Sequence, residues 1–513
     1  MRLELETPRS PAHNSAGSET AARTAAGQGR DIAIGTLELL AVHILLLPVG
    51  LLTAAFLTRQ LGPELYGIFT VAATIVLWVA STTTQLFSRT TVKFLAEAQD
   101  WRAVGSALAR AQLFVSLGAT ALLVAAAPVL ASWLKSPELT AYLRLLALQV
   151  PLLALARVHR SMLMGRRAFG RVTLLTAVYG LSRLVLVFLL VGLGLSLNGA
   201  ILATIGASFA QFIVARVYVR PTILSRAAFP IRPLAGYALP LFLYAIGRDL
   251  FGRVDLMVVK ALGGTPAAAG FYSAAQNLTV PFGLFTASFS SPLLATLSRM
   301  LQHGQIDPAH SIIRQAARLV LCFLPFAGVA AGATPEIIAL VFGRAFSPAA
   351  PLLALLVFGS IANVMISVTT GVLTAAGRPG WTFALTGPLA PLALLAHLAL
   401  VPRFGPIGAA AATTALAWLG AGLTTLAVYR QCGVYPAPAT ILRTTLTTLI
   451  AYALSSAWHT SGAWLIVKLL GLTAVILVFL FLLGELTEQD LAFARSLLRR
   501  ERVRPPALSE QEL

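Results

Sequence analysis

Residues 113–133 read LFVSLGATALLVAAAPVLASW and contain no charged side chain. An α-helix needs about 20 consecutive apolar residues to cross the hydrocarbon core of a bilayer. A membrane-spanning β-strand is shorter and alternates apolar with polar residues, a pattern that this stretch lacks. The stretch therefore predicts a transmembrane helix.

Fourteen apolar runs of this kind follow one another along the chain, and residues 113–133 belong to the third. Their predicted bounds are 35–57, 66–87, 106–133, 141–163, 173–195, 198–219, 235–260, 270–297, 315–342, 350–374, 382–401, 405–428, 441–457 and 463–484. The predicted fold class is an all-α polytopic membrane protein with about fourteen transmembrane helices.

The composition excludes a soluble protein. Of the 513 residues, 57% are hydrophobic and 11% are charged, and the mean hydropathy is +0.82. Ordinary globular chains are roughly 25% charged. The net charge of +19 does not indicate a nucleic-acid partner, because the basic residues are scattered between apolar runs. The two cysteines and seven histidines lack the spacing of a metal site, so no metal or cofactor is predicted.

The basic residues also predict the orientation. With a cytoplasmic N-terminus, twenty-eight lysines and arginines fall in the inner segments and six fall in the outer segments. Membrane proteins carry such an excess on the cytoplasmic side. An even number of spans then places both termini in the cytoplasm.

Both ends of the chain are polar. Residues 1–31 predict a disordered cytoplasmic tail. Residues 485–513 predict a second cytoplasmic tail, in which Leu491, Ala494 and Leu498 would line one face of a basic amphipathic helix. That helix would lie on the anionic inner leaflet, and a solvated tail is the alternative.

The chain repeats itself about 200 residues apart. Arg59-Gln-Leu-Gly62, followed by Gly67-Ile-Phe-Thr-Val-Ala-Ala73, resembles Lys260-Ala-Leu-Gly263, followed by Gly270-Phe-Tyr-Ser-Ala-Ala275. Two shorter likenesses come later in the same order. The match favours an internal duplication over chance similarity between Ala-rich helices.

The repeat contains six spans and therefore predicts two lobes in parallel orientation. The N-lobe would cover residues 32–222, the C-lobe residues 233–430, and two further spans residues 441–484. Duplication of this kind is typical of transporters, whose substrate site lies between the halves.

The same residues carry a family resemblance. Arg59-Gln-Leu-Gly-Pro-Glu-Leu-Tyr-Gly67 resembles the LGP-x-x-YG signature of polysaccharide-export flippases, and residues 87–97 resemble their second inner loop. Residues 253–263 and 270–274 resemble the signature of the second half. From about residue 32 onward, the chain is similar to the O-antigen and exopolysaccharide branch of the multidrug/oligosaccharidyl-lipid/polysaccharide exporter superfamily.

The resemblance implies a flippase of the bacterial inner membrane and not an enzyme. Its substrate would be a polyprenyl-diphosphate-linked oligosaccharide for polysaccharide or lipopolysaccharide biosynthesis. The lipid tail would stay in the bilayer while the diphosphate and sugars cross between the lobes by alternating access. Other polysaccharide-assembly membrane proteins are implied as further partners.

Three alternatives stay open. A cation-coupled multidrug antiporter of the same superfamily usually has twelve spans and an acidic site in its first lobe, where this chain offers Glu38. A flippase for the peptidoglycan lipid precursor also has fourteen spans, but its usual first-span arginines are missing here. A membrane polymerase or glycosyltransferase usually has a large loop or an acidic catalytic motif, and neither is evident in this sequence.

Charged side chains inside spans are costly and therefore mark candidate sites. The seventh predicted span contains Arg248, Asp249, Arg253 and Asp255. Arg248 and Asp255 fall near one helix face, and Asp249 and Arg253 are spaced to form a salt bridge. We predict that the cluster faces a watery cavity and binds an anionic head group, because a guanidinium can donate two hydrogen bonds to phosphate. The alternative is that the charges only brace the bundle.

Arg183, in the fifth predicted span, is the other candidate for substrate binding, unless it extends to the interface or pairs. Arg59 and Lys260 occupy matching positions near the outer ends of the first and seventh spans. They could form a basic pair at an outer gate, although interfacial anchoring is favoured.

Weaker candidates lie nearer the inner side. Gln85 and Arg89 could line the inner cavity mouth, and Glu38 and His43 could bind a coupling ion, H+ or Na+. Lys468 in the last span is expected to extend towards the interface.

Overall fold

The computed structural model describes residues 15–97, 101–166, 168–219, 254–434 and 437–485. Within these ranges, side chains are described except for residues 15–41, 43, 85–97, 101–103, 284–292, 295 and 379. Throughout the described ranges the regular structure is helical and contains no strand. Most of these helices are longer or more apolar than those of soluble proteins.

The first half of the chain begins with a long element that contains two predicted spans. Helix α1 (Ser15–Glu97) changes direction at Gly62, whose φ of 70° suits glycine, and Pro63 follows this break. The remaining elements of this half are α2 (Trp101–Trp133), α3 (Leu139–Ala147), α4 (Gln149–Gly165), α5 (Phe169–Leu190), the π-helical η1 (Val191–Leu195) and α6 (Ser196–Tyr218).

The second half contains long helices as well as several short segments joined at breaks. Its elements are α8 (Val254–Gly263), α9 (Pro266–Gln302), α10 (Ile306–Cys322), α11 (Leu324–Gly332), α12 (Thr334–Val341), the 3-10 helix η2 (Arg344–Ala349), α13 (Ala350–Ala375), α14 (Pro379–Thr386) and α15 (Leu389–Cys432). Two more helices follow, α16 (Pro438–Ala457) and α17 (Trp464–Leu482).

Eight helical stretches of the described chain are long and apolar enough to cross a membrane. Three of them contain a non-helical glycine that divides the stretch into two predicted spans, at Gly62, Gly194 and Gly405. Within the stretch that includes residues 113–133, the 18-residue window with a mean hydropathy of 2.2 is only 17% buried. Apolar side chains exposed on this scale require lipid as their solvent. The all-α polytopic prediction is confirmed, while the number fourteen stays a prediction.

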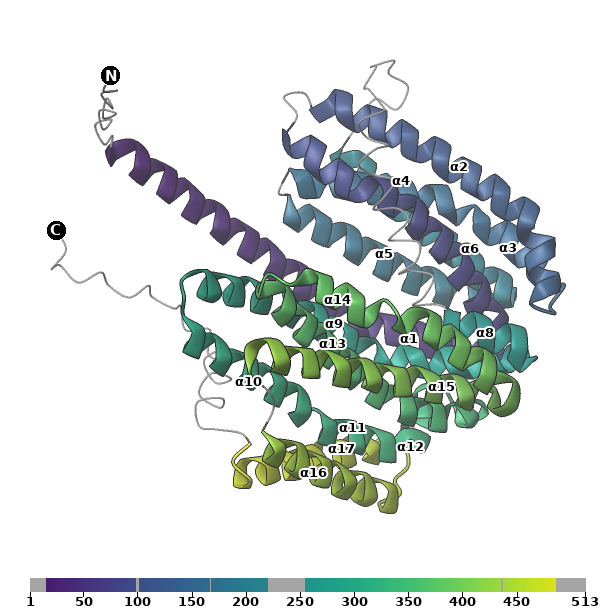
Figure 1. Cartoon of the computed structure of the whole chain (residues 1–513). Coiled ribbons are helices and arrows are strands. Elements are labelled where there is room, and N and C mark those ends of the chain that lie inside the picture. Colours follow the sequence, from purple (N-terminus) through teal and green to yellow (C-terminus); the bar gives the residue numbers. More distant parts are fainter. Residues whose placement is uncertain (1–14, 98–100, 167, 220–253, 435–436, 486–513) are drawn as a thin grey trace.

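The helices form two groups that lie side by side (Figure 1). Helices α1 to α6 make one group, in which Phe56 of the first part of α1 stacks on Phe188 of α5, and α8 to α15 make the other. The two groups contact each other mainly through α1 and α9. We call the first group the N-lobe and the second the C-lobe, and the bounds that the repeat predicts for them stay a prediction.

Helix α16 packs on the C-lobe through glycines of α11. A Cβ at Gly328 would lie 2.7 Å from the carbonyl oxygen of Thr448, and a Cβ at Gly332 would lie 2.7 Å from Cβ of Ser455. The Ser455 hydroxyl donates to the carbonyl of Val329 over 2.8 Å. Small residues let membrane helices approach this closely, so α16 is a firmly attached part of the C-lobe.

The predicted tails differ from the described structure at one end. Helix α1 begins at Ser15, so part of the predicted disordered segment 1–31 is helical. Residues 15–30 are rich in alanine and contain no proline, which favours a helix continuous with the first span. Residues 1–14 and the predicted amphipathic helix beyond Glu485 lie outside the described residues.

Candidate functional site

The two lobes touch most closely where the repeat signatures meet. A Cβ on Gly67 of α1 would collide with the carbonyl of Pro266, and a Cβ on Gly270 of α9 would collide with the carbonyl of Pro63. Each signature glycine therefore packs against the backbone of the opposite lobe, as small residues do at close helix crossings. We call the contacts of Tyr66, Gly67, Gly270 and Phe346 between the lobes the seam.

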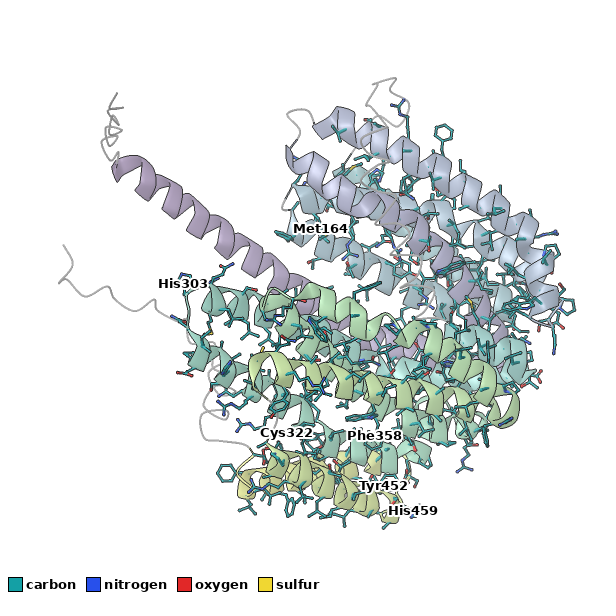
Figure 2. All side chains as sticks on the ribbon, in the orientation of Figure 1. Met164, His303, Cys322, Phe358, Tyr452 and His459 are labelled. Carbon is teal, nitrogen blue, oxygen red and sulfur yellow. The ribbon has the colours of Figure 1, made fainter. Side chains whose placement is uncertain are left out.

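Aromatic side chains complete the seam beside the glycines. Phe346 of η2 is fully buried, and its ring packs edge-on against Tyr66 of the N-lobe and Phe271 of the C-lobe, with centroids 5.8 Å apart in both pairs. Edge-to-face pairs at this separation are favourable. The seam therefore closes one end of the space between the lobes. Met164, at the end of α4, and His303, just after α9, both lie towards the opposite end (Figure 2).

A cavity of about 640 Å³ lies between the lobes next to the seam. We call it the inter-lobe cavity. Its polar lining consists of Thr53, Tyr66, Thr70, Thr74, Arg183, Ser273 and Asn277, from α1, α5 and α9. The amide of Asn277 donates to the Tyr66 hydroxyl over 2.9 Å and so links the lobes across this space. The rest of the lining is apolar and includes Leu46, Leu47, Leu51 and Val280.

Arg183 is the basic residue of this lining. Its side chain is half-buried, and its Nε has no hydrogen-bond partner among the described residues. A guanidinium is a strong, forked donor that favours phosphate and carboxylate. The structure therefore places Arg183 where an anionic group between the lobes could reach it.

A second cavity, of about 430 Å³, lies inside the C-lobe. We call it the C-lobe cavity. Its polar lining consists of Asp255, Gln276, Thr279, Ser360, Asn363, Thr386, His397 and Thr413. Asp255 is buried at the start of α8, and its Oδ2 accepts from the Tyr272 hydroxyl over 2.9 Å and from the Gln276 amide over 2.6 Å. These hydrogen bonds come from neutral groups, and no lysine or arginine of the described chain lines this cavity beside the carboxylate.

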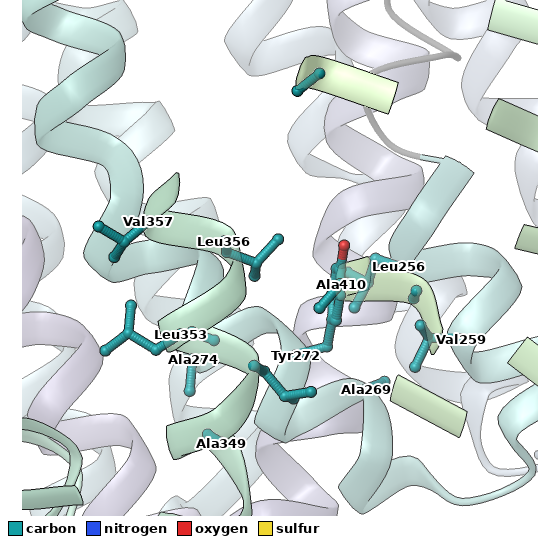
Figure 3. Close-up of a cluster of buried hydrophobic side chains, with 14 of the residues drawn as sticks. Leu256, Val259, Ala269, Tyr272, Ala274, Ala349, Leu353, Leu356, Val357 and Ala410 are labelled. Carbon is teal, nitrogen blue, oxygen red and sulfur yellow. The ribbon is translucent and has the colours of Figure 1, made fainter. Parts of the chain in front are cut away.

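The hydrogen bonds continue from Asp255 across the cavity wall. The Tyr272 oxygen lies 3.3 Å from Oγ1 of Thr413, which lies 3.2 Å from Nε2 of His397. Nδ1 of His397 contacts the carbonyl of Ala393. Figure 3 shows Tyr272 among apolar residues of α8, α13 and α15, which shield this network from lipid. A carboxyl group and an imidazole joined by hydroxyls can bind or pass a proton.

Helix α9 separates the two cavities. Gln276 lines the C-lobe cavity, whereas its neighbour Asn277 lines the inter-lobe cavity. The sequence prediction missed Tyr272, Gln276 and His397. Two sequence features could have identified Gln276 and His397. Gln276 and Asn277 are adjacent amides inside an apolar run, and His397 is the single histidine of the run 382–401.

Of the predicted seventh-span cluster, Arg248, Asp249 and Arg253 lie outside the described residues. Asp255 is described, but it lines the C-lobe cavity, while Arg183 lines the inter-lobe cavity. The two predicted substrate-binding residues that the structure describes are therefore not brought together.

Arg59 and Lys260 have different surroundings despite their matching repeat positions. Arg59 is exposed on α1, and its Nη2 donates to the carbonyl of Leu340 in the C-lobe. Lys260 is only 1% exposed, and its ammonium has no hydrogen-bond partner among the described residues. Interfacial anchoring is therefore wrong for Lys260, because its side chain packs inside the protein.

The remaining candidates lie in helix α1. The backbones of Glu38, His43, Gln85 and Arg89 are helical, and their side chains lie outside the described residues. The described residues also contain no group of His, Cys, Asp and Glu that could hold a metal ion.

Comparisons with known proteins agree with this architecture. A family model described as "polysaccharide biosynthesis protein" matches residues 56–351. No curated protein matches the sequence.

Solved structures show which fold the two lobes share. A structure of the lipid II flippase MurJ in an inward closed conformation superposes with a TM-score of 0.73 at 16% identity, covering 90% of this chain and 99% of that one. An inward-facing multidrug resistance MATE family transporter of the MOP superfamily gives 0.55 at 15% identity, over 78% of this chain and 94% of that one. A mutant of the MATE transporter VcmN of Vibrio cholerae gives 0.52 at 16% identity, over 78% of this chain and 98% of that one. The chain therefore has the fold of these three structures.

Proposed function

Because this chain belongs to the polysaccharide biosynthesis protein family, we propose that it is a flippase for a polyprenyl-diphosphate-linked oligosaccharide. It would act in the bacterial inner membrane, with both termini cytoplasmic, and would perform no chemical reaction on its substrate. The glycan would serve polysaccharide or lipopolysaccharide synthesis, as in the O-antigen and exopolysaccharide branch, and other assembly proteins of that pathway would be partners.

The observation that carries this proposal is the position of Arg183 in the inter-lobe cavity. Its guanidinium stands among hydroxyl and amide groups, including those of Thr70 and Asn277, that suit a diphosphate and sugars. Leu46, Leu47 and Val280 in the same lining suit the first carbons of a lipid tail. The cavity therefore combines the two chemistries of an amphipathic lipid-linked substrate.

Transport would proceed by alternating access. In the described state the seam closes one end of the inter-lobe cavity, and the positive-inside orientation would make this the outer end. Rocking of the lobes would separate Gly67 from Gly270 and open the cavity outward. The substrate site itself would stay between the lobes.

Coupling to an ion, H+ or Na+, would use the C-lobe cavity. The buried carboxyl of Asp255 and its hydrogen bonds to Tyr272 and Gln276 support this part of the proposal. Charged groups inside membrane proteins are costly and mark ion pathways when they line cavities. Glu38 and His43 stay proposals as a second ion site in the first span.

The test replaces Arg183 in a strain that lacks the native gene. Arg183→Ala should reduce surface glycan at least about tenfold, because a charge-assisted contact to the diphosphate contributes about 1.5–3 kcal/mol. Arg183→Lys should restore export only in part, since an ammonium keeps the charge and loses the fork. Arg403→Ala is the matched control, because Arg403 is exposed on α15. Normal export from Arg183→Ala at normal membrane levels would refute the proposed role of this cavity.

A second candidate is a flippase for the peptidoglycan lipid precursor. The likeness to MurJ favours it, because that structure superposes with a TM-score of 0.73 over 99% of its own chain. Complementation separates the two functions. Rescue of growth after depletion of the native lipid II flippase would support this candidate, and rescue of surface glycan alone would support the first.

A further inference from the structure

Helix α17 carries a charge that the structure neutralises inside the protein. Lys468 was expected to extend to the interface, and that expectation is wrong, because its side chain is 0% exposed. Its Nζ donates to Oε1 of Glu336 in α12 over 2.9 Å, and the Glu336 side chain is only 12% exposed. A buried ion pair gives a protein little net stability over apolar packing. We therefore expect a role of the Lys468–Glu336 pair other than stability.

Helix α12 also contacts the N-lobe, at the end opposite to Glu336. The Leu340 carbonyl is in the last turn of α12, where carbonyl groups lack helical partners and carry partial negative charge. It accepts a hydrogen bond from the guanidinium of Arg59, which belongs to the N-lobe. Helix α12 is therefore held by α17 at its first turn and by α1 at its last turn.

Helix α12 packs on α13 and η2, and a break on each side separates it from its neighbours in sequence. Ala333 separates it from α11, and Gly343, with a φ of 93°, separates it from η2. Phe346, the aromatic residue of the seam, follows directly in η2. A shift of α12 would therefore move both the Leu340 carbonyl and the segment that fills the seam.

Helix α17 is itself fixed at its far end. Glu485, just after α17, accepts from the Thr440 hydroxyl over 3.0 Å and pairs with Arg443 over 3.2 Å, both on α16. Because α16 packs tightly on α11, Lys468 projects from a rigid support. The ion pair can therefore fix the position of α12 relative to the C-lobe.

We propose that the Lys468–Glu336 pair is a positioning device for the seam. It holds α12 so that the Leu340 carbonyl faces Arg59, and it thereby stabilises the closed arrangement of the lobes. This gives α16 and α17, which lie outside the repeat, a role in gating. The inference rests on alternating access from the proposed function, but it does not depend on which substrate is carried.

The experiment measures the distance across the seam by pulsed electron spin resonance. Spin labels are attached at Glu64→Cys in α1 and Ser347→Cys in η2, which are both exposed, after Cys322 and Cys432 are replaced by serine. The purified full chain is studied in lipid nanodiscs without substrate, so the readout does not require transport. The parent protein should show a dominant short distance that reports the closed seam.

Lys468→Met should raise the ratio of the long-distance to the short-distance population about tenfold, the effect of about 1.4 kcal/mol. Arg59→Gln should do the same, and Lys468→Met combined with Arg59→Gln should add little, because both act through one hydrogen bond. The exchange Lys468→Glu with Glu336→Lys should restore the short distance. Arg403→Met, which removes an exposed charge from α15, is the control and should leave the distances unchanged.

An unchanged distance distribution in Lys468→Met would overturn the proposal, as would full additivity with Arg59→Gln. If Lys468→Met does not insert, Lys468→Met with Glu336→Met removes both charges and keeps apolar packing. This pair should open the seam to the same extent, and a closed seam in it would also overturn the proposal. A failure of the proposed substrate would appear only in the Arg183 export test and would leave these distances as expected.

Discussion

Gly67 of α1 and Gly270 of α9 occupy matching positions of the internal repeat and pack against each other across the two lobes. The sequence motif that predicts the duplication is thus also the place where the two lobes meet. Its glycines follow from geometry, because a Cβ on either residue would strike the backbone of the opposite helix. A closed seam therefore requires the smallest residue at both positions.

Gly270→Ala should prevent the seam from closing fully. The added methyl group would collide with the Pro63 carbonyl, and overpacking of this kind costs about 1–3 kcal/mol. We expect a dominant long distance in the spin-label measurement and at least a tenfold loss of export. Gly118→Ala in α2 is the matched control, because no neighbouring atom lies within 4 Å of its added methyl. A closed seam in Gly270→Ala would show that the contact has no role in gating.

Tyr66→Phe removes the hydroxyl that accepts from the Asn277 amide between the lobes. A single hydrogen bond contributes about 0.5–1.5 kcal/mol, so the open fraction should rise by a factor of about two to ten. Tyr452→Phe on α16 is the control, because Tyr452 is exposed away from the seam. Equal distance distributions in both variants would mean that the Asn277 contact does not stabilise closure.

Asp255→Asn should uncouple transport from the ion gradient while the fold persists. The carbonyl oxygen of the asparagine can still accept from the Tyr272 hydroxyl. Its NH2 group replaces the oxygen that accepts from the Leu256 N–H, and the loss of that hydrogen bond costs about 1 kcal/mol of stability. Transport in proteoliposomes should then lose its dependence on pH and on Na+. Asp307→Asn, at an exposed position of α10, should keep the dependence of the parent. A persistent ion dependence in Asp255→Asn would exclude this carboxyl as the coupling group.

Sequence patterns predicted the apolar helices, because the length of an apolar run is a local signal, and repeated motifs predicted the duplication. Arg183 was identified because a charge inside a span is unusual, and the structure places it in the inter-lobe cavity. His397 and Tyr272 were missed because neutral polar residues acquire their meaning from partners on other helices. The structure joins them through Thr413, which is 141 residues from Tyr272.

Lys468 was interpreted wrongly for a similar reason, because its partner is also distant in the sequence. When a lysine lies near the end of an apolar helix, its side chain usually extends to the membrane–water interface. The sequence around Lys468 gives no reason to expect otherwise. The partner that reverses this interpretation, Glu336, is 132 residues away in a short helix. The sequence also could not predict that Asp255 and Arg183 line different cavities. Which cavity a residue lines depends on the face of α9 that its own helix contacts.

Lys260 leads to a prediction about stability and function together. Its side chain is 1% exposed, and its ammonium has no hydrogen-bond partner among the described residues, which is costly for a buried charge. Lys260→Met keeps the length and apolar stem of the side chain and removes the amine. It should therefore stabilise the protein by about 1–3 kcal/mol and raise the melting temperature in detergent. Arg403→Met, at an exposed arginine of α15, should leave the melting temperature unchanged.

Export separates the two reasons for which such a lysine could be present. If Lys260 meets the diphosphate when the seam opens, Lys260→Met should be more stable and yet export at least tenfold less glycan, a trade-off expected at functional sites. Lys260→Arg should then recover part of the export, because it restores the charge. Higher stability with full export would show that the amine has no part in transport. A fall in melting temperature would show that the ammonium is satisfied in the folded protein, and the stability prediction would be wrong.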